Sequence, residues 1–213
     1  MDAGILVYDG ADELDVVGPF RVLHAANEVR PYVKDAPLWH VHVIGETRAP
    51  MTLSNGLIVT PTASFSDAPD LDVVVVPGGG GERTDRGRHH EEHHAPTLAW
   101  LQQRRPTANV IAGVGTGVFV LAAAGLVDGR RVNTHWQDRD ALVRFMAERG
   151  ARVQVVGSRV VDDGDLVTAG GLAAGIDLGL ELVDRYGGAD QCRGVELVLE
   201  IETPGEADLA PPL

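Results

Sequence analysis

The chain has 213 residues, of which 44% are hydrophobic and 23% charged, and this composition predicts one compact globular domain. Its formal net charge of −13 argues against a nucleic acid or an anionic membrane as partner, because both require clustered lysine and arginine. Small molecules or proteins are therefore the more plausible ligands, and we expect a small-molecule substrate.

The N-terminus begins with a strand-length apolar run over residues 5–8 and carries no basic segment before it. This pattern predicts neither a signal peptide nor a membrane span. We expect a cytoplasmic protein with a single domain over residues 1–201. Residues 202–213 are rich in proline and acid, which predicts a flexible tail.

Apolar runs typical of buried strands alternate with helical patterns along the chain, which predicts an α/β sandwich around a mostly parallel sheet. The expected strands are Gly4–Tyr8, Trp39–Ile44, Leu57–Thr60, Val73–Val76, Val110–Ala112, Arg131–Thr134, Val153–Val156, Val160–Asp162 and Leu166–Ala169. The expected helices are Val16–Glu28, Thr97–Arg104, Val118–Ala124, Asp138–Arg149, Gly175–Tyr186 and Ala189–Ile201.

In such sheets, ligands bind beyond the carboxyl ends of the strands. Three loops at that edge are candidates for the site: the loop after Tyr8, the glycine run after Val76 and the turn at Gly115. The run Gly78–Gly81 lacks the helix and spacing of a dinucleotide fingerprint, and no P-loop lysine is present. We expect no cofactor.

The connection Gly80–Ala95 contains a histidine cluster, His89–His94. The cluster fits the zinc-protease pattern H-E-x-x-H, but its surroundings are polar on all sides, as in a solvated loop. We expect no metal site. Because the connection follows a predicted site loop directly, we interpret it as a lid, whose deletion over Arg83–His93 would alter turnover or KM without unfolding the protein.

The turn over residues 113–117 joins a strand to an alanine-rich helix, a junction that forces one residue into a strained backbone conformation and aims it into a cleft. We predict that this residue is Gly115, with a positive φ. Glycine supplies no nucleophile, so covalent catalysis from this turn is unavailable. The single cysteine, Cys192, lies far away in the sequence and is interpreted as a partly buried structural thiol.

Five segments carry a resemblance to a known family. They are residues 8–19 (YDGADELDVVGP), 77–79 (PGG), 114–126 (VGTGVFVLAAAGL), 134–136 (THW) and 169–177 (AGGLAAGID). In this order the chain resembles the ThiJ/PfpI superfamily, and most of all its isonitrile hydratases and the related domains of AraC-type regulators. The resemblance implies a flavodoxin-like three-layer α/β sandwich and a homodimer.

The resemblance also implies roles for individual residues. The acidic partner of the family's cysteine matches Asp15, which would point into the cleft and act as a general acid or base. From the residues alone, Asp15 could instead cap the following helix. Glu13 is the weaker candidate, and Asp177 more plausibly holds a helix entrance.

Backbone N–H groups of Gly78, Gly79 and Thr116 match the family's oxyanion-type site. The glycines could equally form a tight turn, and Thr116 could cap a helix. His135 matches a family histidine that follows a strand beside the elbow, where it could shuttle protons or serve as a structural hydrogen-bonding residue. Trp136 is expected to form a wall of the pocket.

The family's elbow cysteine is replaced here by Gly115. The leading hypothesis is an enzyme that needs no nucleophile and uses Asp15 for hydration, elimination, or an imine or iminium ring closure of the Pictet-Spengler kind. A second hypothesis is a non-catalytic binding or regulatory module, weakened because no DNA-binding region follows residue 201. A third is an engineered inactive isonitrile hydratase.

Overall fold

The computed structural model describes residues 1–80 and 85–201 and is built on a seven-stranded sheet in the order β10-β11-β7-β6-β1-β2-β5. All neighbouring strands pair in parallel except β10, which runs antiparallel to β11 at one edge. The predicted flavodoxin-like fold class is confirmed. The strands are β1 (Asp2–Leu6), β2 (His40–Gly45), β5 (Ala63–Ser64), β6 (Val73–Val76), β7 (Val110–Val114), β10 (Val160–Asp162) and β11 (Leu166–Ala169).

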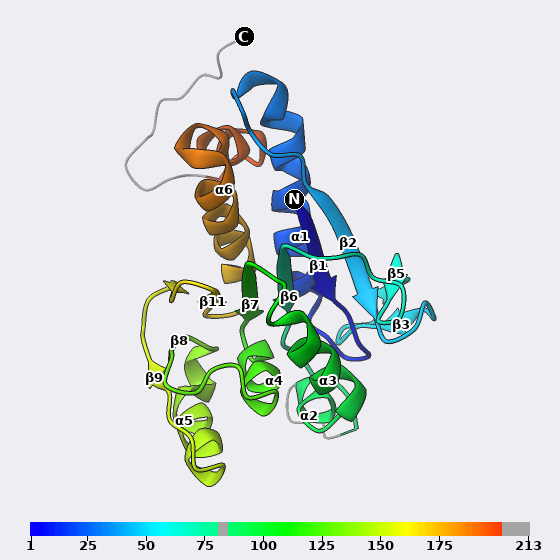
Figure 1. Ribbon diagram of the computed structural model, residues 1–213, viewed down its shortest axis with the longest axis vertical. Coiled ribbons are helices and arrows are strands. Elements are labelled where there is room, and N and C mark those ends of the chain that lie inside the picture. Colours follow the sequence, from blue (N-terminus) through cyan, green and yellow to red (C-terminus); the bar gives the residue numbers. More distant parts are fainter. Residues whose placement is uncertain (81–84, 202–213) are drawn as a thin grey trace.

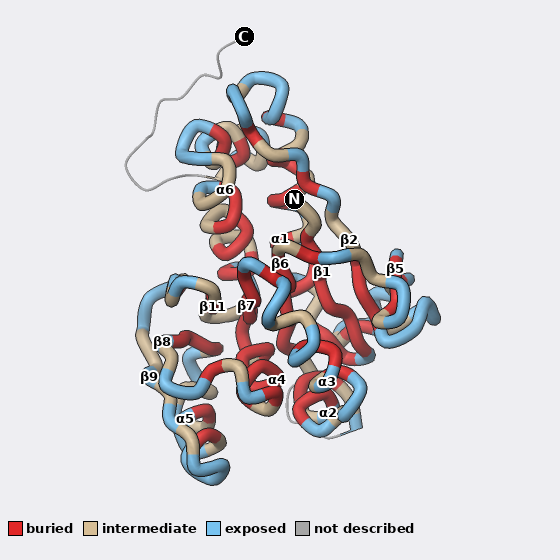
Figure 2. Tube along the Cα trace, viewed as in Figure 1, coloured by how far each residue is buried: buried red, intermediate tan, exposed pale blue. Residues whose placement is uncertain are grey.

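The central strands are buried along their whole length, because helices cover both faces of the sheet. All residues of β6 and β7 are buried, and most of them are β-branched or small. Figure 2 shows these central strands in red and the surface loops in pale blue.

Two helices, α1 (Glu13–Val29) and α6 (Ala174–Val198), pack against each other on one face (Figure 1). On the other side, α4 (Gly117–Ala123) contacts α2 (Arg88–Glu91), α3 (Ala95–Arg104) and α5 (Arg139–Glu148). The 3-10 turn η1 (Arg30–Tyr32) follows and contacts α1, and the 3-10 turn η2 (Trp136–Asp138) precedes and contacts α5. No helix in the described ranges combines the length and apolar character needed to cross a membrane.

Three predicted strands do not enter the main sheet. The run at Leu57–Thr60 forms β4 (Ile58–Val59), which pairs with β3 (Met51–Thr52). The runs at Arg131–Thr134 and Val153–Val156 form a second pair, β8 (Arg131–Val132) with β9 (Gln154–Val155). In β4, Ile58 is 65% exposed, so this apolar run is not a buried strand as its pattern predicted.

The two helices predicted after residue 175 form the single element α6, which is interrupted at Gly188, where φ is +79° and ψ is +170°. Only a local break separates them, so the two predicted patterns correspond to its two halves. The predicted tail, residues 202–213, lies outside the described residues.

The carboxyl ends of β1, β6, β7 and β11 are neighbours in the sheet. In Figure 1 the arrowheads of β1 and β2 point to the half of the molecule that holds α2 and α4. The segments that leave these strand ends therefore meet at one edge, and they carry all the predicted site residues except His135 and Trp136, which follow β8.

Candidate active site

The strand-to-helix elbow at Gly115 joins β7 to α4, and its φ is +54°, which confirms the predicted left-handed conformation. A Cβ atom built on Gly115 would lie 3.1 Å from Asp15 Oδ2 and 3.2 Å from the Cα of Gly171. The space that a side chain would occupy is therefore narrow, and it borders directly on the Asp15 carboxyl group.

Asp15 lies in the first turn of α1, and only 2% of its surface is exposed. The helix is capped by Asp12 instead, whose side chain accepts hydrogen bonds from the N–H groups of Leu14 and Asp15. The alternative interpretation of Asp15 as the helix cap is therefore wrong.

Both oxygens of the Asp15 carboxyl group accept backbone hydrogen bonds. Oδ2 accepts from Gly78 N–H at 2.9 Å and Oδ1 from Leu172 N–H at 3.1 Å. Burial raises the pKa of Asp15 to about 7, although these two bonds act in the opposite direction. At neutral pH the group is therefore divided between its acid and base forms, which is suited to proton transfer.

The turn after β6 is built around glycines because other backbone segments approach it closely. A Cβ on Gly79 would lie 2.3 Å from Asp12 N, a separation that no real Cβ adopts. The Tyr8 hydroxyl group donates a hydrogen bond that is shared between the carbonyl oxygens of Pro77 and Gly78. This buried hydroxyl fixes the turn that holds Asp15.

The two glycine N–H groups predicted to face a substrate oxyanion already have acceptors. Gly78 N–H binds Asp15, and Gly79 N–H binds Thr116 Oγ1 at 3.2 Å. The glycines position the acid and the threonine rather than presenting free donors, which corrects the predicted role of the turn. Thr116 makes no side-chain capping bond to α4.

His135 lies beside the elbow, but a loop and not a main-sheet strand brings it there. A Cβ on Gly171 would lie 3.3 Å from His135 Cδ2, and the preceding Thr134 donates its hydroxyl to Gly115 O at 2.8 Å. His135 Nδ1 lies 3.3 Å from Asp138 Oδ2. This contact orients the imidazole ring.

Trp136 does not line the cavity, so its predicted role as a pocket wall is wrong. It opens the turn η2, and its side chain is 68% exposed. The turn directs Trp136 outward, and the next two residues, Gln137 and Asp138, face the cavity in its place.

The segment predicted as a solvated lid is partly a packed wall. Arg88 and Glu92 are buried and form an ion pair at 2.8 Å, with the Arg88 guanidinium 4.1 Å above the centre of the Phe119 ring. Backbone bonds from Gly87 N–H to Asp9 O and from Arg88 N–H to Gly79 O fix the start of α2. The predicted lid also includes residues 81–84, which lie outside the described residues.

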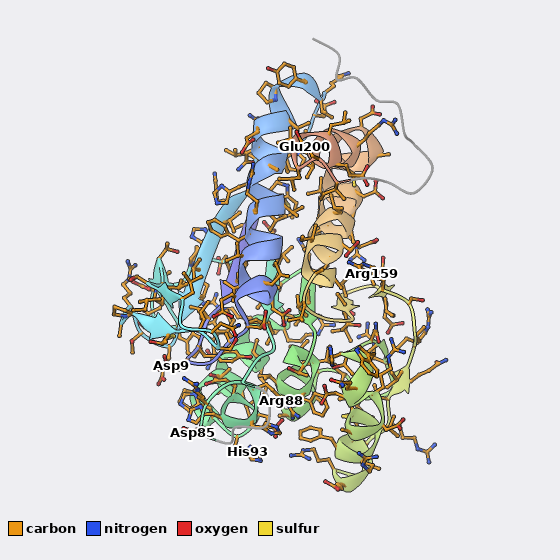
Figure 3. The ribbon with its side chains drawn as sticks, turned by 180° about the vertical axis from the view of Figure 1, so that it is seen from behind. Asp9, Asp85, Arg88, His93, Arg159 and Glu200 are labelled. Atoms are coloured by element: carbon orange, nitrogen blue, oxygen red, sulfur yellow. The ribbon has the colours of Figure 1, made fainter. Side chains whose placement is uncertain are left out.

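The predicted lid has a packed part and an outer part. Figure 3 shows Arg88 among the helices and His93 at their outer edge. The histidine cluster is divided, since His89 borders the elbow cavity whereas His90 and His94 border a smaller cavity of about 190 Å³ next to Tyr8. Among residues 1–80 and 85–201, no three potential ligands are arranged to hold a metal ion.

A cavity of about 490 Å³ lies at the elbow, between Asp15, Gly115 and His135, and its size suits a small organic molecule. Nearly all of its lining is polar or glycine. It is lined by Asp12, Asp15, Gly79, Arg88, His89, Gly115, Thr116, His135, Gln137, Asp138, Gly171 and Leu172. The structure thus gathers the predicted Asp15, Gly79, Gly115, Thr116 and His135, and Gly78 lies behind them.

Sequence reasoning gave no site role to five residues of this lining, Asp12, Gln137, Asp138, Gly171 and Leu172, and it placed Arg88 and His89 only in the predicted lid. The sequence offers a signal for Asp12, because an acidic residue three positions before Asp15 fits a helix cap. Arg88 begins α2, Asp138 ends η2 and Leu172 precedes α6, and only the tertiary structure brings them to the cavity.

Three other residues singled out in the sequence lie outside the cavity lining. Glu13 accepts hydrogen bonds from Ser54 Oγ and Asn55 N, and Asp177 pairs with Arg159 at 2.6 Å near the start of α6. Cys192 is a half-buried free thiol, and burial raises its pKa to about 11, which keeps it protonated.

Comparison with known proteins identifies the family of this chain. The family described as the DJ-1/PfpI family matches residues 1–185. An isonitrile hydratase from Pseudomonas putida is 36% identical over 200 residues, which cover 94% of this chain and 78% of the relative. A transcriptional regulator from Pseudomonas aeruginosa, CdhR, is 28% identical over 203 residues, and the match spans only 53% of that protein.

Solved structures show the same fold. A ThiJ/PfpI family protein from Pseudomonas syringae superimposes with a TM-score of 0.79 and 31% identity, covering 100% of this chain and 77% of the other. Drosophila melanogaster DJ-1beta superimposes with a TM-score of 0.77, covering 95% of this chain and 98% of the other; at 22% identity it supports the fold alone.

Proposed function

Because the chain belongs to the DJ-1/PfpI family, we propose that it is an isonitrile-hydratase-like enzyme without an elbow nucleophile, which works by general acid–base catalysis through Asp15. The observation that carries the proposal is the buried carboxyl group, whose pKa lies near 7 and whose Oδ2 borders the empty side of Gly115. A substrate atom in the place of the absent side chain would lie within reach of that oxygen.

The proposed chemistry needs no covalent intermediate. In its neutral form Asp15 donates a proton to the substrate, and in its ionised form it accepts one, so one donation and one acceptance return it to its starting state. Hydration, elimination, and imine or iminium ring closure of the Pictet-Spengler type all fit this sequence. Thr116 and His135 are the proposed further polar contacts for a small organic substrate in specialised metabolism, in a cytoplasmic enzyme without a cofactor.

A paired assay tests the proposal. The wild type and Gly115→Cys are incubated with an alkyl isonitrile, and formation of the N-alkylformamide, the product of adding one water, is followed. Activity in the cysteine variant alone would indicate an intact hydratase pocket that glycine has redirected or silenced. Inactivity in both would move the search to acid–base cyclisations, where Asp15→Asn should lower turnover at least about a hundredfold.

The alternative function is a non-catalytic binding or regulatory module. It is favoured by the regulator relatives, of whose length the chain spans about half. Asp15→Asn discriminates the two. In a binding module this variant would change ligand affinity without any turnover to lose, whereas in the enzyme it should abolish turnover while the ligand still binds.

A further inference from the structure

Leu172 has an unusual backbone. Its φ is +49°, and in the described residues it shares a positive φ among non-glycine residues only with Asp35 and Glu200. A leucine in this region is strained, because its Cβ crowds the backbone, and such residues persist where the surrounding structure holds them and often lie at functional sites. Glycine or asparagine would adopt the same conformation with less strain.

The strained conformation of Leu172 positions its backbone N–H group against the Asp15 carboxyl group. It turns Leu172 N–H toward Asp15 Oδ1, a bond of 3.1 Å between residues that are 157 positions apart in the chain. The carbonyl group of Leu172 accepts a hydrogen bond from Gly175 N–H at the start of α6. The backbone at this position is therefore fixed from both sides, but glycine would satisfy the same two bonds, so the bonds do not explain the leucine side chain.

The side chain itself borders the elbow cavity and is 47% exposed. Among the described residues that line this cavity, Leu172 supplies the one aliphatic side chain; the others are charged, polar or glycine. Small-molecule sites are usually lined mainly by apolar groups. In this polar cavity, any discrimination between ligands by their apolar substituents therefore depends on Leu172 alone among the described lining residues.

We propose that Leu172 determines the substrate specificity of the elbow cavity, by packing against an apolar substituent of a neutral or polar-headed substrate whose reacting end faces Asp15. This inference rests on the proposed function only in taking the cavity as the substrate site. The substrate class is then a small molecule with a polar reacting group and one compact hydrocarbon or aromatic substituent.

Binding of two neutral probes tests the proposal without requiring turnover. N-methylformamide and N-cyclohexylformamide share a polar head and differ in the apolar substituent, and the amide resonance of Gly115 reports their dissociation constants by NMR titration. We expect the wild type to bind the cyclohexyl probe about tenfold more tightly. In Leu172→Gly this preference should fall to about twofold or less, while affinity for the methyl probe stays the same.

Two matched variants control the result. Asp35→Gly relieves the same kind of backbone strain at φ +59°, and Val17→Ala removes an apolar side chain that is 42% exposed outside the cavity lining. Both should keep the tenfold preference. Leu172→Asn, which keeps the left-handed backbone but has a polar side chain, should lose it as Leu172→Gly does.

The proposal is overturned if Leu172→Gly keeps the preference, if either control loses it, or if the wild type binds neither probe. Its failure can be separated from failure of the proposed function, because the binding ratio is independent of catalysis. Full turnover by Asp15→Asn would refute acid–base catalysis and leave the role of Leu172 standing.

Discussion

The carboxyl group of Asp15 lies in an environment that favours its neutral form. Burial raises its pKa from the ordinary 3.8 to about 7. The folded protein therefore binds one proton more than the unfolded chain between these two pH values, so Asp15 makes folding less favourable as pH rises through that window. By this shift, its ionisation lowers the free energy of unfolding by about 4 kcal/mol above pH 7.

Asp15→Asn should reveal this cost. The asparagine side chain has one oxygen, so one of the N–H groups of Gly78 and Leu172 loses its acceptor, which costs about 1–3 kcal/mol at any pH. At pH 4.5 the variant should be less stable than the wild type, and at pH 8 the order should reverse. Urea unfolding at both pH values measures the difference in free energy of unfolding between the variant and the wild type. If this difference does not change with pH, the raised pKa of Asp15 is contradicted.

The elbow between β7 and α4 depends on glycine for space as well as for backbone conformation. Gly115→Ala should lower the free energy of unfolding by about 1–3 kcal/mol, because it adds strain at φ +54° and presses on Asp15 Oδ2. The matched control is Gly129→Ala, at φ +72°, where a Cβ would meet no atom within 4 Å. Equal losses in thermal or urea unfolding would show that contact with Asp15 is unimportant.

The helix α2 contributes to the cavity wall through a buried ion pair. Arg88→Met should destabilise the protein by about 3–5 kcal/mol, because Glu92 then stays buried without its arginine partner and keeps the longer contact of 3.3 Å to His89 Nδ1. The double variant Arg88→Met/Glu92→Gln should recover more than half of this loss. Urea unfolding of both single variants and the double variant gives the coupling energy, and strictly additive losses would mean that the pair is not coupled.

At the scale of the whole molecule, we propose a homodimer, which the family resemblance implies. Sedimentation equilibrium should give a mass near twice the 22.6 kDa of one chain, about 45 kDa. The measurement should be repeated at low micromolar concentration, because a weak association would dissociate there. A mass of 22.6 kDa at all concentrations would contradict the proposal.

Much of the architecture was predictable from local pattern. The runs Val73–Val76, Val160–Asp162 and Leu166–Ala169 form strands with the predicted boundaries. The first and third are buried along their whole length, as is typical of continuous apolar runs in strands covered on both faces. The left-handed Gly115 was also predictable, since a tight strand-to-helix junction admits few residues at its apex. Local pattern did not separate β4, β8 and β9 from the main sheet, because strand partners depend on distant residues.

The sequence by itself determined the α/β fold class, the edge of the sheet that carries the site, and the absence of a nucleophile at Gly115, since periodicity and residue identity are local properties. The tertiary structure alone decided the state of Asp15. Its pKa depends on burial and on N–H groups from Gly78 and Leu172, which are 63 and 157 residues away. It likewise decided that Trp136 faces outward and that Leu172 borders the cavity, because the direction of a loop side chain is set by the contacts of the folded chain.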